Sequence, residues 1–387
     1  MILRLSLLTY QCPHVNLIQL PLPDIDDLRE RELMSTETPV FRANELNVEG
    51  EARIYRTLRH FWHPVAYAQD LVGAPIGFTL CGRDIVVVRL EGDVVAFDDL
   101  CAHRGTKLSL GQVLDNCLLE CRYHGWRYDK NGECVIVPQR PDLASRLKAR
   151  VRKYLAEERL GMIWVALVDE PHFPLPDYPQ WNEPEYHHVA VPSVDWACSA
   201  PRRVENYTDY SHFPILHDKT LGDRTQPEVP PHEVWREANR LENRQGAGSW
   251  IRVPVDTAAW GGKDLPPDPY IRFAGDWRVF MPLTCVLNLL FEDGNRYHLL
   301  FHPTPIGPKK IRNFTIASRN FGNPENKDKE LGEFVTLVYD QDQPVVESQR
   351  PEELPEDLSE EIHLKGVDTF SVDYRRWLLA LADELED

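Results

Sequence analysis

The sequence has few basic residues, few cysteines and no long apolar run. Its 387 residues include 43 Lys and Arg against 61 Asp and Glu, a formal charge of -18. This excess of negative charge disfavours binding to nucleic-acid phosphates or anionic lipid. Eight cysteines without paired spacing do not suit a disulfide scaffold and favour a reducing compartment, the cytoplasm. The longest apolar run, 162–168, is far shorter than the roughly 20 residues that span a bilayer.

The N-terminal ten residues superficially resemble a secretory signal. Arg4 and Ser6 interrupt their apolar run, and no small-residue cleavage site follows, so a cleaved signal is not expected. Residues 1–50 are predicted to be an extension, either disordered or upstream of a true start at Met34.

Abundant proline and scarce glycine, 31 and 21 residues, favour strands joined by loops over long helices. Residues 52–170 are predicted to be all-β because short β-branched or apolar runs alternate there with turn signals; the runs are 85–90, 94–97, 118–121, 134–137 and 162–167. A linker rich in proline and aromatics, 169–192, leads to an α+β half. The expected helices there are 202–217, 330–346 and 374–386, and the expected strands are 279–291 and 298–301.

Two short motifs give the sharpest signal in the sequence. Cys101 and His103 form a C-x-H motif, and Cys121 and His124 form a C-x-x-H motif after seventeen intervening residues. Two thiolates and two neutral imidazoles are the ligand set of a Rieske [2Fe-2S] centre, in which two histidines replace two cysteines on one iron. A zinc ion held by the same four residues is the alternative. Glycines close behind both histidines favour the cluster, because backbone N–H groups can approach it where no Cβ intervenes.

A second group of metal-binding residues lies in 205–217. The spacing places Asp209 and His212 at i and i+3 of a predicted helix, and Pro214 disturbs that helix so that His217 can turn back toward His212. Two imidazoles and one carboxylate would form a facial triad with open positions for O₂ chemistry at Fe(II). Two histidines at this spacing also occur by chance, so the interpretation depends partly on the upstream motifs.

The combination of C-x-H-R-G, C-x-x-H-G-W and N-x-x-D-x-x-H-x-x-x-x-H resembles the α subunits of Rieske non-haem iron oxygenases. The resemblance runs from about residue 53 to 385 and is strongest to the α-only group of methylxanthine N-demethylases and aromatic O-demethylases. It implies an α+β chain, with an all-β Rieske [2Fe-2S] domain in 51–172 and a helix-grip (START-like) catalytic domain with an antiparallel sheet in 173–387. It also implies a homotrimer assembled head to tail.

The resemblance implies a role for each residue of the second motif. His212 and His217 bind the mononuclear iron, and Asn206 is in register with the family's asparagine. Asp209 is not the third ligand in that family. It bridges the iron site to a cluster histidine of the neighbouring subunit, here His124, and links the two metals for electron transfer.

The third iron ligand is expected further along, in residues 339–349. The resemblance aligns Asp342 with the family's ligand carboxylate, and Asp340 is the alternative. Both acids could instead cap or solvate a helix.

The region around the cluster motifs is basic although the chain is acidic. Residues 101–153 hold eleven Lys and Arg against five acids. The simplest interpretation of these basic residues is that they form a solvated surface. The hypothesis is that part of it docks an acidic ferredoxin or a flavin reductase beside the cluster.

The sequence thus predicts the terminal oxygenase of a multicomponent system. NADH electrons from a separate reductase would reach the cluster and then Fe(II), which activates O₂ to hydroxylate or oxidatively N- or O-demethylate a small aromatic or heterocyclic substrate. Ring (di)hydroxylation is one alternative, and a Rieske electron carrier without its own catalysis is another. Asn288, a polar residue in the apolar run 279–291, is expected either to orient a substrate heteroatom or to be a structural amide.

Overall fold

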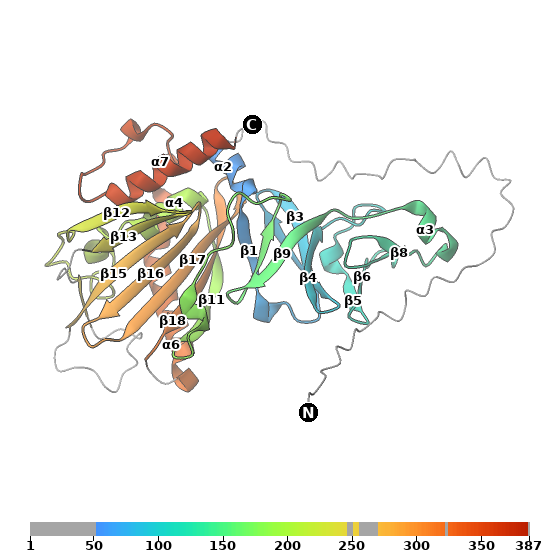
Figure 1. Ribbon diagram of the computed structural model, residues 1–387, viewed down its shortest axis with the longest axis horizontal. Coiled ribbons are helices and arrows are strands. Elements are labelled where there is room, and N and C mark those ends of the chain that lie inside the picture. Colours follow the sequence, from blue (N-terminus) through green and yellow to red (C-terminus); the bar gives the residue numbers. More distant parts are fainter. Residues whose placement is uncertain (1–51, 246–250, 255–269, 322–323, 386–387) are drawn as a thin grey trace, which may run out of the picture. The chain divides into compact units, whose positions relative to one another are not determined.

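The described part of the chain divides into two units, and both are rich in antiparallel β-strands (Figure 1). The computed structural model describes residues 52–245, 251–254, 270–321 and 324–385. The predicted extension, 1–50, lies outside these residues. The first unit holds 68–79 and 83–158, and the second holds 52–67, 80–82 and 159–385. The predicted domain boundary after residue 172 stays a prediction.

The first unit contains strands of two sheets. Four strands of the larger sheet belong to this unit, in the spatial order β9-β4-β3-β2; they are β2 Ile76–Leu80, β3 Arg83–Leu90, β4 Asp93–Asp98 and β9 Lys153–Arg159. The smaller has the order β5-β6-β7-β8 and consists of β5 Gln112–Leu114, β6 Leu118–Glu120, β7 Arg127–Tyr128 and β8 Cys134–Ile136. Short helical turns connect them: η3 Ala68–Asp70, η4 Leu108–Leu110, η5 Pro141–Leu143 and α3 Ala144–Leu147.

Local sequence explains the central hairpin of this unit. β3 and β4 pair antiparallel through a two-residue turn in which Glu91 and Gly92 both have positive φ, 54° and 88°. Such a turn matches the twist of the strands it joins. β3 buries Val86 and Val88 in a core that also includes Cys101 and Cys121. The cysteines of both motifs therefore lie against a packed sheet.

A larger antiparallel sheet forms the centre of the second unit. Its strand order is β11-β18-β17-β16-β15-β13-β12, and β14 also pairs with β15. The strands are β11 His187–Trp196, β12 His232–Glu237, β13 Arg240–Gln245, β14 Ile251–Pro254, β15 Tyr270–Phe280, β16 Thr284–Phe291, β17 Arg296–Gly307 and β18 Lys310–Arg319. Two further strands of this unit, β1 Trp62–Tyr67 and β10 Met162–Ala166, pair with each other antiparallel.

The described helices of this unit are α2 Arg53–Thr57, α4 Ala200–Thr208, α5 Phe213–Leu216, α6 Pro324–Ser348 and α7 Thr369–Glu384, with the turns η2 Leu58–His60, η6 Pro179–Asn182 and η8 Leu358–Glu360. Three of the helices pack on the sheet. α6 packs on β11, α4 on β17, and α7 on β12 and β13. The predicted α+β class is thereby confirmed. In the described part of the chain, every helix is too short or too polar to cross a membrane.

Two predicted elements were wrong in detail. The expected helix over 202–217 is interrupted, because α4 ends at Thr208 and Asp209 is extended, with φ −99° and ψ 108°. The Asp209 carboxylate accepts hydrogen bonds from the Ser211 N–H (2.7 Å) and hydroxyl (2.5 Å), a local turn that competes with the helix. The expected strand over 279–291 is also two strands, because Pro282 has no N–H for a sheet ladder and lies in the turn between β15 and β16.

Candidate metal centres

The two cysteine-histidine motifs form a pair of loops with the same backbone geometry. In the first, the Gly105 N–H donates to the Cys101 carbonyl at 2.8 Å; in the second, the Gly125 N–H donates to the Cys121 carbonyl at 3.0 Å. Both glycines have positive φ, 68° and 70°. A residue with a Cβ would be strained in either position. The glycines therefore allow each loop to fold back tightly behind its histidine.

The side chains of the four predicted cluster ligands converge between these loops. The Nδ1 atoms of His103 and His124 lie 3.1 Å apart. The thiols of Cys101 and Cys121 are buried neighbours, and the hydrogen bond from Cys101 lowers the pKa of the Cys121 thiol. Two sulfurs and two ring nitrogens brought together in this way fit the mixed ligand set of a Rieske cluster.

Tyr128 on β7 is a cluster neighbour that sequence reasoning missed. Its hydroxyl accepts the Ala102 N–H at 3.0 Å and lies 3.1 Å from the Cys101 sulfur. Burial raises the pKa of Tyr128, so the hydroxyl stays protonated and can donate to that sulfur. Hydrogen bonds to cluster sulfurs tune the reduction potential of iron–sulfur centres.

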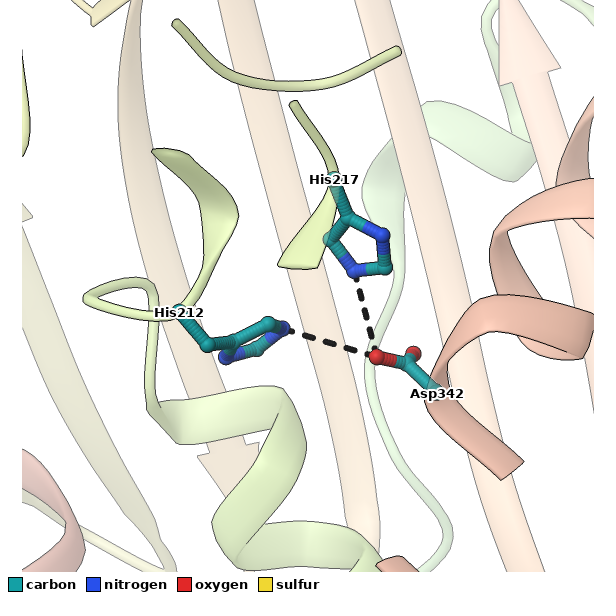
Figure 2. A group of neighbouring side chains, drawn as sticks. All are labelled: His212, His217 and Asp342. Atoms are coloured by element: carbon teal, nitrogen blue, oxygen red, sulfur yellow. Dashed lines mark ion pairs between the residues drawn. The ribbon is translucent and has the colours of Figure 1, made fainter. Parts of the chain in front are cut away.

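The second group of predicted ligands comes together in the second unit (Figure 2). Nε2 of His217 lies 3.1 Å from Oδ1 of Asp342, and Nε2 of His212 lies 3.6 Å from the same oxygen. One ligand atom from each residue falls within 4.8 Å of the others. His212 immediately precedes α5, His217 immediately follows it, and Asp342 lies on α6. The arrangement has the donor set of a facial triad.

The two candidate carboxylates of α6 lie on different sides of the helix. Residues two apart on an α-helix are separated by about 200° around its axis. Asp342 is buried beside the histidines, whereas Asp340 is exposed. The geometry therefore favours Asp342.

Arg203 and Asn206 on α4 hold the Asp342 carboxylate. Nη1 of Arg203 donates to Oδ2 at 3.0 Å, and the Asn206 amide is 3.3 Å from Oδ1. Burial alone raises the pKa of the Asp342 carboxyl, but the contact with His217 and the charge of Arg203 outweigh it and hold the pKa well below its usual range. Asp342 is thus an anion with one oxygen turned to the histidines and the other to Arg203.

Both histidines of the triad also have a partner at their second nitrogen. Nδ1 of His217 donates to the Gln341 side-chain oxygen at 2.7 Å, which leaves Nε2 available to a metal. Nδ1 of His212 lies 3.4 Å from a carboxylate oxygen of Asp209. Burial alone raises the pKa of Asp209, but His212 and Ser211 outweigh it and lower the pKa below its usual value. Gln341 was not foreseen from the sequence.

An apolar pocket adjoins the triad. His212, His217 and Asp342 line one part of it, and the walls come mainly from aromatic and aliphatic side chains of the sheet and α6, among them Phe273, Leu287, Leu289, Leu299, Phe301 and Val338. Asn288 is not among the lining residues. It accepts a hydrogen bond from His298 at 2.6 Å and acts as a structural amide.

Comparisons with known proteins agree with these two centres. Residues 61–153 match the Rieske [2Fe-2S] domain family, and residues 196–384 match the vanillate O-demethylase oxygenase C-terminal domain family. Methylxanthine N3-demethylase NdmB of Pseudomonas putida is 33% identical over 83% of this chain and 88% of its own length. Methylxanthine N1-demethylase NdmA of the same organism is 32% identical over 84% and 90%.

Solved structures give the same result. NdmA of Pseudomonas putida, in a mutant bound to caffeine, is 30% identical, covers 87% of this chain and 94% of its own, and has a TM-score of 0.74. Dicamba monooxygenase, at 21% identity and a TM-score of 0.67, shares the fold over 84% of this chain and 98% of its own. The chain belongs to the Rieske non-haem iron oxygenases, as the terminal oxygenase component that carries a [2Fe-2S] cluster and a mononuclear iron.

Proposed function

We propose that this oxygenase removes an N- or O-methyl group from a small, planar aromatic or heterocyclic substrate. The observation that carries the proposal is the apolar pocket, which opens directly beside the His212, His217 and Asp342 side chains. The similarity to two N-demethylases over more than four fifths of the chain supports the reaction type. Ring hydroxylation is the alternative, since a 3-chlorobenzoate-3,4-dioxygenase subunit from Comamonas testosteroni is 33% identical over 45% of the chain.

The reaction balances with O₂ and two electrons. One oxygen atom enters the methyl C–H bond, the other leaves as water with two protons, and the resulting hemiaminal or hemiacetal breaks its C–N or C–O bond to release formaldehyde. A separate ferredoxin or flavin reductase supplies the two electrons from NADH.

The ligand roles are also part of the proposal. Cys101, Cys121, His103 and His124 would hold the [2Fe-2S] cluster, which stores and passes on single electrons. His212, His217 and Asp342 would hold the mononuclear Fe(II), which supplies O₂ activation. The support is the convergence of donor atoms at each site. Asn206 and Gln341 would keep Asp342 and His217 in position.

Asp209 is proposed to link neighbouring subunits of a homotrimer through a hydrogen bond. Its carboxylate already lies against His212 and is kept ionised, so its remaining acceptor capacity suits an imidazole N–H from another protomer. His124 is the proposed donor.

Paired substitutions test the oxygenase assignment. His212→Ala and Asp342→Asn should each abolish formaldehyde release and substrate-coupled O₂ uptake, while the visible and EPR spectra of the cluster stay intact. Asp340→Asn is the matched control on the same helix and should retain activity, because Asp340 is exposed. Normal turnover in Asp342→Asn would refute the ligand set, and hydroxylated ring product without formaldehyde would favour the alternative reaction.

The reductase is proposed to dock on the basic residues near the cluster loops. Arg104, Arg122 and Arg150 are exposed. Lys107, Arg127 and Lys130 are instead engaged by acids of this chain, at 2.9, 2.7 and 2.9 Å, and contribute less. Cluster reduction by an acidic ferredoxin should slow as salt is added, because the contact is electrostatic. A rate independent of salt would argue against it. The cytoplasmic location likewise stays a proposal.

A further inference from the structure

Among the described residues of the sheet that line the apolar pocket, two polar atoms have no hydrogen-bond partner. They are Nε1 of Trp277 and the hydroxyl of Tyr297. Trp277 is 3% exposed and Tyr297 is 4% exposed. Burying a polar group without a partner costs about 1–3 kcal/mol of folding free energy, so such a group needs a physical explanation. Their place in the pocket wall points to a ligand.

The strand register places these two side chains on the same face of the sheet. Trp277 on β15 pairs with Leu287 on β16, and Tyr297 on β17 pairs with Leu289 on β16. Alternate residues of a strand share a face, so Leu287 and Leu289 lie between the two polar side chains as an apolar floor. With one strand between them, the backbones at Trp277 and Tyr297 are about 10 Å apart across the sheet. A flat ring system fits between donors arranged in this way.

The Trp277 indole is held rigidly over this floor. A Cβ on Gly275 would come within 2.4 Å of the indole ring, so the absence of a side chain at Gly275 makes room for it. The Tyr210 ring stacks on the indole with centroids 4.8 Å apart. A donor that is fixed before binding loses little entropy when it meets its acceptor.

The chemistry of the two groups restricts what they can bind. An indole nitrogen only donates, so its partner must be an acceptor. Burial raises the pKa of Tyr297, so its hydroxyl keeps its proton and can also donate.

The pocket is also unsuited to an anion. Among its described lining residues, Arg203 and Asp342 are the only Lys, Arg, Asp or Glu, and they pair with each other at 3.0 Å. The guanidinium of Arg203 is further enclosed by the Trp196 and Tyr207 rings, at 3.9 and 4.0 Å. A substrate carboxylate on the sheet side of the pocket would therefore be buried without a free cation.

We propose that Trp277 and Tyr297 are specificity-determining residues that bind an uncharged, planar, N-methylated heterocycle through its ring carbonyl oxygens or unprotonated ring nitrogens. This inference rests on the proposed demethylation and names the substrate class. Molecules that lack an acceptor would leave both donors unpartnered, and aromatic carboxylates would be buried on the apolar floor without a free cation.

The test compares anaerobic binding and turnover in the intact oxygenase with both metals bound. The neutral probes are caffeine, 1,3-dimethyluracil and N-methyl-2-pyridone; the contrasting probes are 1-methylindole and 4-methoxybenzoate. Calorimetry should show binding of at least one neutral acceptor-bearing probe and weaker binding of both contrasting probes. Trp277→Phe and Tyr297→Phe should each weaken that binding about tenfold and raise KM more than they lower kcat.

Tyr374→Phe is the matched control. The Tyr374 hydroxyl is also buried without a partner, but it lies on α7 and outside the pocket lining. It should leave binding unchanged, and the cluster spectra should be the same for all three variants. Equal affinity of wild type and both pocket variants, or preferential binding of 4-methoxybenzoate, would overturn the inference. Binding lost in the variants without any formaldehyde from wild type would instead refute the demethylation and leave the binding role intact.

Discussion

At the scale of single residues, the two carboxylate oxygens of Asp342 face different groups. One oxygen faces the histidines, and the other is held by Arg203, which is fully buried. In the protein without metal, Arg203 is the main positive charge that offsets this buried carboxylate. A bound divalent cation would offset the same charge from the other side, so the two cations compete electrostatically for Asp342.

Arg203→Met should therefore destabilise the metal-free protein more than the metal-bound protein. Breaking a buried ion pair by removing one partner costs about 3–5 kcal/mol, because the remaining charge is left without compensation. A bound metal supplies that compensation, so the rise in melting temperature on adding Co(II), a substitute for Fe(II), should be larger in the variant than in wild type. Arg376→Met changes an exposed arginine and is the control. An equal rise in variant and wild type would contradict this role for Arg203.

Motif spacing could identify only those site residues that are close in sequence or match a family pattern. His212 and His217 were predicted from their spacing within one segment and from the family pattern. Arg203 and Gln341 were missed, because an arginine or glutamine in a helical stretch usually indicates a solvated face. Arg203 meets Asp342 across 139 positions of sequence, a contact that depends on how α4 and α6 pack in the folded unit.

At the scale of elements, a largely buried network of ion pairs joins α4 to α7 and to Glu361. Arg375 on α7 donates to both oxygens of Glu205, at 2.8 Å each, and to Glu361 at 2.6 Å. Arg202 also contacts Glu361 at 2.8 Å. The next residue of α4 is Asn206, which contacts Asp342, so the network positions a helix that supports the iron site. The α+β class and most strands followed from the sequence, but this junction did not, because its partners come from separate elements.

Arg375→Ala should lower the free energy of unfolding of the second unit by about 3–5 kcal/mol, since it leaves the Glu205 carboxylate buried with less compensation. Its neighbour Arg376 is exposed and pairs with Asp373 on the same helix, so Arg376→Ala should change that free energy by less than about 0.5 kcal/mol. Urea unfolding followed by tryptophan fluorescence measures both variants. Similar losses for the two arginines would show that the network contributes no more than a surface pair.

At the scale of the whole molecule, the candidate centres belong to different units of the chain. The cluster ligands all lie in 101–124, within the first unit, and the iron ligands all lie in the second. The ligands of each centre are brought together by contacts within one unit. The route of an electron between the two centres therefore depends on how subunits assemble. The proposed head-to-tail trimer sends the electron from the cluster of one protomer to the iron of the next, through Asp209.

Mixed trimers distinguish this route from transfer within one protomer. A Cys121→Ser chain should lose the cluster, and a His212→Ala chain should lose the iron, so neither homotrimer should be active. In trimers assembled from equal amounts of both chains, an iron-competent protomer meets a cluster-competent neighbour by chance, and formaldehyde release should recover to about a quarter of the wild-type rate per protomer. Adding Asp209→Asn to the Cys121→Ser chain, which holds the working iron, should remove the recovered activity, whereas adding it to the His212→Ala chain should not. If transfer occurs within a protomer, no mixture can be active, because neither chain then holds both centres.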